Sequence, residues 1–201
     1  GWFKDEIVPV EIPQKKGESI RIDSDEVPRR DTSIEKLSRL KSVFKLDGTI
    51  TAGNASSIGD GASVVLVMSE SKAKKLGLKP IAVITGYAVG STEPKMLFYA
   101  PVEAVRKLLK LLGKNIDYFD LIEINEAFSS QVLADGKELE WDWGKVNVHG
   151  GAVALGHPIG ASGARVLTTL LSAMKIRNAK TGLATLCLGG GSAVALSVEA
   201  V

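Results

Sequence analysis

The chain contains 201 residues, of which 25 are Lys or Arg and 23 are Asp or Glu, so its formal net charge is only +2. At roughly 150 residues per domain, this length predicts one large domain or two small ones. Because the positive and negative charges are interleaved along the chain, a nucleic-acid partner is disfavoured.

The single cysteine, Cys187, excludes an internal disulfide and favours a reducing compartment. No unbroken apolar run reaches about 18 residues, and the opening letters GWFKDE resemble neither a signal peptide nor a transit peptide. We therefore expect a cytoplasmic protein without a membrane partner.

The first 58 residues are polar and carry few periodic elements. The clearest is a predicted helix over residues 33–41, where apolar residues recur at helical spacing and Thr32 is placed to cap the amide of Glu35. Beyond this helix the pattern indicates loops and turns. We interpret the region as an accessory, loop-rich segment.

From about residue 63 the pattern changes to alternating strands and helices. The continuous apolar run at residues 64–68 is typical of a strand covered on both faces. The next predicted elements are a helix over Glu70–Leu76 ended by Gly77, a strand at 81–87, an amphipathic helix at 101–112 and a strand at 121–124. This order is typical of βαβ units.

The last third of the chain completes the predicted sheet. We expect a strand at 145–148, a helix at 162–174, and a hairpin whose strands, 183–188 and 193–200, flank three consecutive glycines. The five strands from residue 81 onward predict an α/β fold, with a mixed five-stranded sheet and covering helices.

Reactive polar residues follow or close three of these elements. Asn125 follows the strand at 121–124, His157 lies in a glycine-rich turn before a helix, and Cys187 closes a strand before the glycines. Strand ends hold side chains rigidly while leaving them open to a ligand, so these three residues are the candidate catalytic groups.

Each candidate also has a structural interpretation. A lone cysteine in an apolar strand is often an inert core residue, although the unobstructed N–H groups of Gly189 and its neighbours suit an oxyanion hole. His157 and Asn125 can each be structural residues. In that case Asn125 and the adjacent Glu126 are helix caps.

Other kinds of site are disfavoured by spacing. His149, His157 and Cys187 do not follow a metal-ligand pattern, and we lean to a structural role for His149. The run GHPIGASG has neither the dinucleotide-binding glycine spacing nor a phosphate-loop lysine, and it is one residue short of a nucleophile elbow. We therefore expect no metal, no nucleotide-binding loop and no serine-hydrolase site.

Three motifs, NEAF at 125–128, GGAVALGHPIGASG at 150–163 and CLGGG at 187–191, strongly resemble those of the thiolases, the acyl-CoA C-acetyltransferases. TAGNAS at 51–56 is similar to the coenzyme A loop of that family. The likeness covers essentially residues 1–201 but only the C-terminal half of the family's length.

The resemblance implies a role for each motif. His157 would activate a nucleophilic cysteine and, with a water held by Asn125, bind the thioester oxygen. Cys187 would be the acid/base that removes the α-proton of acetyl-CoA, and the Gly189 N–H would serve a second oxyanion hole. No cofactor is implied; the residues implied to contact coenzyme A are Arg29, Ala52, Ser56, Leu97, Ala127 and Phe128.

A thiolase-type fold would divide the chain into the end of a loop domain (1–58), the closing segment of the N-terminal domain (59–80) and the C-terminal domain (81–201). The implied reaction is condensation of two acetyl-CoA molecules or thiolysis of a 3-ketoacyl-CoA, within a dimer or tetramer. Because the family's nucleophile lies in its N-terminal half, we expect residues 1–201 alone to be inactive without that half as partner.

Two features depart from the family pattern, and two alternative functions stay open. MLFYAP at 96–101 replaces a glycine-containing turn, and His149 stands where many relatives have Asn. The alternatives are a 3-ketoacyl synthase-like enzyme, which the NEAF and CLG motifs argue against, and a non-catalytic subunit that supplies half a site and half a sheet.

Overall fold

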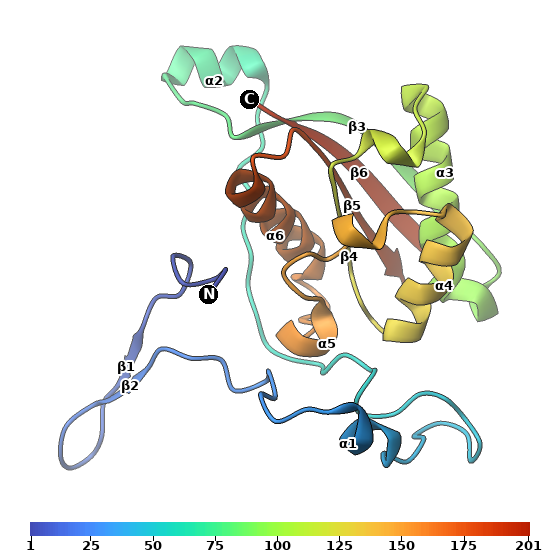
Figure 1. Cartoon of the computed structure of the whole chain (residues 1–201). Helices are drawn as coiled ribbons and strands as arrows, with labels where there is room; N and C mark the ends of the chain where they lie inside the picture. Colours follow the sequence, from blue (N-terminus) through green and yellow to red (C-terminus); the bar gives the residue numbers. More distant parts are fainter.

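A mixed four-stranded sheet organises the C-terminal part of the computed structural model, which describes residues 1–201 (Figure 1). Its strands are β3 (Ala82–Ser91), β4 (Leu121–Ile124), β5 (Thr181–Leu188) and β6 (Ser192–Ala200). Their spatial order is β3-β6-β5-β4; only the β4–β5 pair is parallel. The α/β prediction is confirmed.

Helices cover both faces of this sheet (Figure 1). α3 (Ala100–Leu112) and α4 (Ser129–Leu139) pack on one face, where Leu108 and Phe119 are fully buried. α6 (Ser162–Arg177) packs on the other face through Val166 and Leu170. The amphipathic pattern of both long helices therefore places one apolar stripe of each against the sheet.

The prediction of a strand at residues 145–148, one of the five expected in the sheet, is wrong. Trp143–Lys145 form a 3-10 turn (η3), and Val146 makes a single isolated parallel bridge to Ile122. The following residue, Asn147, has a φ of 44°, a left-handed conformation that interrupts an extended strand. The segment instead lies beside β4 and contributes a side chain to the site.

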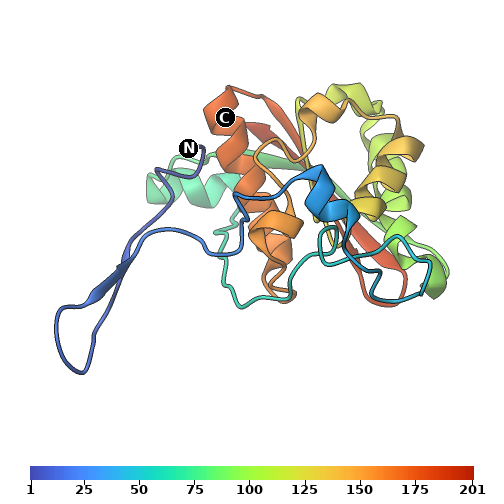
Figure 2. The same ribbon diagram turned by 60° about the horizontal axis from the view of Figure 1, so that its bottom comes forward.

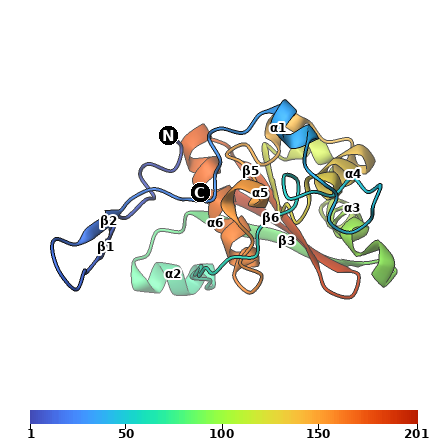
Figure 3. The ribbon, with the colours of Figure 1, turned by 90° about the horizontal axis from the view of Figure 1, so that it is seen from below.

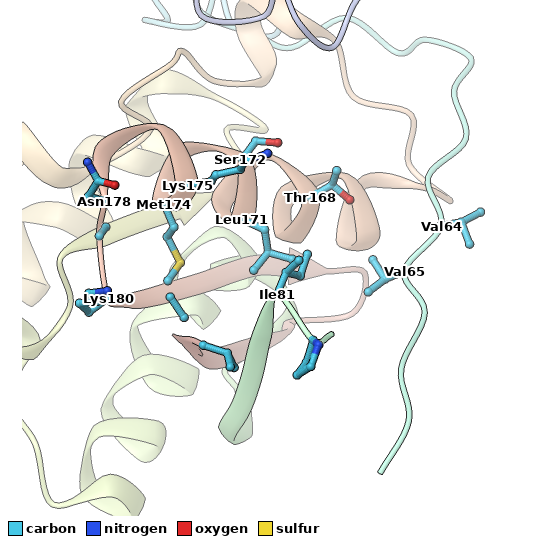
Figure 4. Close-up of a pocket in the computed structure, with 14 residues that line it drawn as sticks. Val64, Val65, Ile81, Thr168, Leu171, Ser172, Met174, Lys175, Asn178 and Lys180 are labelled. Atoms are coloured by element: carbon cyan, nitrogen blue, oxygen red, sulfur yellow. The ribbon is translucent and has the colours of Figure 1, made fainter. Parts of the chain in front are cut away.

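The predicted strand at residues 64–68 is also wrong. The segment is extended but has no strand neighbour among residues 1–201, and Val64 and Leu66 are 90% and 77% exposed. An apolar run specifies a strand only where another strand supplies hydrogen-bond partners. Figure 4 shows this segment beside α6 and Ile81, where these elements enclose an open hollow of about 610 Å³.

The remaining predicted elements are present; the helix at 70–76 and the strand at 121–124 have the predicted bounds, and the others have shifted ends. The first helix, α1, is shorter than expected (Ile34–Ser38), and Ser33 rather than Thr32 caps it by accepting a hydrogen bond from the Lys36 N–H. α2 (Glu70–Leu76) ends at Gly77, whose φ is 66°. The strand predicted at 81–87 extends to Ser91 as β3, and the helix predicted at 162–174 extends to Arg177 as α6.

The first 80 residues form little structure of their own. β1 (Val10–Ile12) and β2 (Ile20–Ile22) make an exposed hairpin that projects away from the rest of the chain (Figure 2). Residues 51–58 are different because they are hydrogen-bonded to the C-terminal part. No helix in the structure combines the length and the apolar character needed to cross a membrane.

Candidate active site

The three candidate residues gather at the carboxyl ends of two parallel strands. Asn125 follows β4, and its N–H donates to the carbonyl of Thr185 on β5 at 3.0 Å. Cys187 lies two residues farther along β5. Because β4 and β5 run in the same direction, both residues lie at the same edge of the sheet.

His157 contacts Asn125 directly. The Nδ2 atom of Asn125 lies 3.3 Å from His157 Nε2, while His157 Nδ1 lies 2.6 Å from Ser162 Oγ. Ser162 donates its only proton to the carbonyl of Pro158, at 3.0 Å, so its oxygen accepts from the imidazole. This arrangement assigns the proton of neutral His157 to Nδ1 and leaves the Nε2 lone pair facing the Asn125 amide.

Local backbone geometry explains why His157 is held there. Gly156 has a φ of 90°, which a residue with a side chain rarely adopts, and the His157 N–H donates to the carbonyl of Ser57 at 2.8 Å. Pro158 follows and leads into α6. The imidazole is thus fixed between residues 51–58 and the start of α6.

Asn125 is fully buried and is anchored by groups that the sequence reasoning missed. Arg165 donates to Asn125 Oδ1 at 3.3 Å and to Glu123 Oε1 at 3.2 Å. Asn147 donates to the carbonyl of Ile124 at 3.0 Å and accepts from its N–H at 2.8 Å, which fixes the end of β4. Asn125 therefore does not cap a helix.

Two pKa values reflect this packing. Burial lowers the pKa of His157, and the positive charge of Arg165 lowers it further. Burial raises the pKa of Glu123 to about 8, although the guanidinium of Arg165 opposes that shift. A neutral imidazole with an available lone pair can accept a proton from a thiol or another acid.

Glu126 has a structural role. Its Oε2 atom accepts from the Val153 N–H at 3.0 Å, at the start of α5 (Ala152–Leu155), and its Oε1 atom accepts from the Ser129 hydroxyl at 2.7 Å. A carboxylate there satisfies a free helix N–H group. Helix capping, the structural interpretation of Glu126, therefore describes its contacts.

Cys187 is half-buried and its side chain makes no hydrogen bond to Asn125 or His157. Burial raises the pKa of its thiol, and the charge of Asp135 on α4 raises it further. The thiol form is therefore favoured at neutral pH, so formation of the thiolate needs a proton acceptor or added hydrogen-bond donors.

The glycines after Cys187 form the β5–β6 turn. Gly191 has a φ of 89°, and a Cβ atom placed on it would lie 2.6 Å from the carbonyl oxygen of Thr92. Gly189 is exposed, and its N–H makes no backbone hydrogen bond in the turn. That N–H is free to donate to a ligand beside Cys187.

Four of the six residues implied to contact coenzyme A lie together beside this edge. Ser56 donates to the carbonyl of Ala127 from both its N–H and its hydroxyl, each at 3.0 Å. The ring of Phe128 packs edge-to-face on Phe98 at 5.0 Å, next to Leu97 in the 3-10 helix η1 (Pro94–Tyr99).

The other two implied contacts are less closely associated with the site. Ala52 is exposed in the turn that leads to Ser56. Arg29 is exposed before α1, and its side chain makes no hydrogen bond or ion pair. The structure does not bring Arg29 into contact with the catalytic candidates.

His149 lies outside the catalytic cluster. Its ring stacks on Trp2 with a centroid distance of 4.9 Å, and both ring nitrogens are buried without a hydrogen-bond partner. These contacts fit the structural role favoured from the sequence. No group of three or more His, Cys, Asp or Glu side chains is placed to hold a metal ion.

Ser162 and Arg165 are the functional candidates that the sequence analysis overlooked. One signal was available for Arg165, since it lies in the first turn of α6, where the helix dipole disfavours a positive charge. An arginine at such a position indicates a specific acidic or carbonyl partner. Ser162 gave no comparable signal.

Comparison with known proteins adds independent evidence. The family model described as "Thiolase, C-terminal domain" matches residues 78–200, and "Thiolase, N-terminal domain" matches residues 1–71. An acetyl-CoA acetyltransferase of Chromobacterium violaceum is 57% identical over 199 residues, which is 99% of this chain and 51% of that relative.

Two solved structures share the fold. The crystal structure of the Bacillus anthracis acetyl-CoA acetyltransferase matches with a TM-score of 0.93 and 47% identity, over 100% of this chain and 51% of that one. Human mitochondrial 3-ketoacyl-CoA thiolase matches with a TM-score of 0.88 and 38% identity over the same shares. The chain spans about half the length of the curated relatives it matches.

Proposed function

The chain belongs to the thiolase family, and from this premise we propose that residues 1–201 supply the proton-transfer side of an acyl-transfer site for coenzyme A thioesters. The reaction is condensation of two acetyl-CoA molecules to acetoacetyl-CoA, or the reverse thiolysis of a 3-ketoacyl-CoA. The observation that carries the proposal is the placement of Asn125, His157 and Cys187 around one edge of the sheet.

In the first half of the reaction, the Nε2 lone pair of His157 takes the proton of a nucleophilic cysteine supplied from outside residues 1–201. The thiolate attacks the thioester carbon, and the carbonyl oxygen becomes negative. The His157 Nε2–H and a water held by Asn125 donate to that oxygen. Coenzyme A leaves as its thiolate and takes a proton from the Cys187 thiol, so Cys187 becomes a thiolate while His157 keeps its proton.

In the second half, Cys187 as thiolate removes an α-proton from acetyl-CoA, and the Gly189 N–H stabilises the enolate oxygen. The carbanion attacks the acyl-cysteine, a new C–C bond forms, and the nucleophilic cysteine leaves as a thiolate, which takes its proton back from His157. Residues 51–58 and the pair Phe98–Phe128 line the approach of the coenzyme A chain.

A chimera tests this proposal. In this chimera, the unmatched N-terminal part of the Chromobacterium violaceum relative is fused before Gly1. It supplies the half of the family's length that residues 1–201 lack. We expect the chimera to cleave acetoacetyl-CoA with added coenzyme A, and residues 1–201 alone to show no turnover. A chimera that unfolds cooperatively and is acetylated but catalyses neither direction would contradict the proposal, as would turnover by residues 1–201 free of longer species.

A further inference from the structure

Arg165 is a partly buried cation beside the site that the proposed reaction does not use. Its side chain is 17% exposed, and that of its ion-pair partner Glu123 is 2% exposed. One amine of the guanidinium donates to Glu123 Oε1 at 3.2 Å and to Thr169 Oγ1 at 3.4 Å; the other donates to Asn125 Oδ1 at 3.3 Å. The guanidinium therefore spans the end of β4 and the first turns of α6.

The contact with Asn125 has a chemical consequence because a carboxamide has an acceptor end and a donor end of similar size. A guanidinium can only donate, so the Oδ1 atom of Asn125 must face Arg165. The Nδ2 atom then faces His157, where it lies 3.3 Å from Nε2. If the amide were reversed, its Oδ1 atom would face the Nε2 lone pair of His157, so two acceptors would meet without a proton between them.

We propose that Arg165 is a positioning residue that holds the Asn125 amide with its NH₂ group directed toward His157, and that Glu123 anchors the guanidinium. Only the consequence for turnover rests on the function proposed above. The orientation of the amide is a property of the folded chain.

The charges around His157 agree with this role. Burial lowers the pKa of His157 and the charge of Arg165 lowers it further, so the imidazole stays neutral. Glu123 on β4 faces Arg165, and Glu126 is bonded to the Val153 N–H and the Ser129 hydroxyl. The nearby Cys187 on β5 favours its neutral thiol form.

NMR of the 201-residue chain tests the orientation without any assay of turnover. The chain has only two histidines, so each imidazole can be titrated separately. The main variant is Glu123→Gln with Arg165→Met, since replacing both partners avoids leaving the buried Glu123 carboxyl without its partner. We expect a higher His157 pKa, an unchanged His149 pKa and faster solvent exchange of the Asn125 side-chain amide protons.

Two further variants separate charge from orientation. Arg165→Lys keeps the charge but not the planar fork, so it should keep the low His157 pKa and lose the protection of the Asn125 amide. Arg177→Met is the matched control because Arg177 lowers the pKa of His149. It should raise the His149 pKa alone. A double variant that stays folded with unchanged His157 pKa and unchanged Asn125 exchange overturns the proposal.

Turnover in the chimera tests the consequence for catalysis. Glu123→Gln with Arg165→Met should lower kcat by about 10²–10³, as loss of one oxyanion donor does, with little change in KM. Adding Asn125→Ala should cause no comparable further loss, since the residues act as one unit. If the variants show the expected NMR changes but the chimera has no activity, the proposed function is rejected and the proposed orientation of the Asn125 amide is not. An active chimera whose variant turns over within about threefold of the parent would reject the catalytic role of Arg165.

Discussion

Residues 1–80 and residues 81–201 differ sharply in how far they are packed. Of the 41 buried residues, only Ala73 precedes residue 81. Seen from below in Figure 3, the sheet and its helices form a compact body while the first region runs as extended chain around it. The β1–β2 hairpin is exposed throughout.

The difference shows which parts of the proposed site are fixed within this chain. Asn125, His157 and Cys187 lie in the packed region, and Asn125 and His157 have hydrogen-bond partners there. In the first region, only residues 51–58 join that body by several backbone hydrogen bonds, from Ser56 to Ala127 and from His157 to Ser57. The apolar run at 64–68 has no comparable partner.

The largest expected effect tests whether the packed region carries proton transfer. Cys187→Ala in the chimera should lower condensation of acetyl-CoA by about 10²–10⁴, the usual contribution of a general acid/base. Acetylation of the other cysteine should continue, because acyl capture and α-proton removal are separate steps. Mass spectrometry of the acetylated protein and a condensation assay measure the two steps. Condensation within about tenfold of the parent would instead make Cys187 a core residue.

The next effect concerns Asn125 and His157, which the structure joins directly. Each substitution to Ala in the chimera should lower turnover by about 10²–10³, with His157→Ala the larger because His157 also activates the nucleophile. The double variant should be little worse than the worse single variant. Steady-state kinetics of the three variants measure this. Penalties that multiply, or an Asn125→Ala variant with intact turnover, would exclude a shared oxyanion hole.

The sequence predicted the packed region better than the first region, and the physical reason is local. α3 has an apolar stripe and a glycine that ends it, so its position follows from spacing alone. Residues 64–68 have the same apolar character as a buried strand, but strand pairing depends on a neighbour that the run itself cannot specify. Asn147 ended the predicted fifth strand through a left-handed backbone conformation.

The candidate site shows the same division. Strand ends and glycine-rich turns located Asn125, His157 and Cys187 because those signals are local. Ser162 and Arg165, the residues that orient them, lie on α6. The sequence pattern of that helix indicated only the apolar residues that face the core. Hydrogen bonds between distant segments leave no periodic pattern, so the tautomer of His157 and the orientation of Asn125 required the structure.

A pH-dependent prediction compares one carboxyl group from each region. Burial raises the pKa of Asp135 on α4 to about 7, whereas a hydrogen bond from Lys36 lowers that of the exposed Asp31. The unfolded Asp135 carboxyl loses its proton near pH 4 and the folded one near pH 7, so ionisation progressively lowers stability across this window. Asp135→Asn should remove that loss.

The expected gain for Asp135→Asn is up to roughly 4 kcal/mol above pH 7, shrinking as the pH falls toward 4. Asp31→Asn is the matched control. Its carboxylate stabilises the folded state at pH values above its unfolded pKa, so its removal should give no gain at any pH. Urea unfolding at several pH values measures both. A gain from Asp135→Asn that does not depend on pH would show that burial does not control the ionisation of this carboxyl group.

The smallest expected effect is the change in the free energy of unfolding when a glycine in each region is replaced by alanine. It tests how tightly each region is packed. A Cβ atom on Gly90 of β3 would lie 2.2 Å from the backbone N of Ala104 on α3, whereas one on Gly59 would meet no atom within 4 Å. Because neither backbone can retreat without separating α3 from the sheet, Gly90→Ala should lower the free energy of unfolding by about 1–3 kcal/mol. Gly59→Ala should change it by less than about 0.5 kcal/mol, since it fills open space at a surface position. Urea unfolding of both variants at one pH supplies the comparison. Equal changes would mean that α3 and β3 are no more closely packed than the extended chain before them, and the contrast between the two regions would then lose its physical basis.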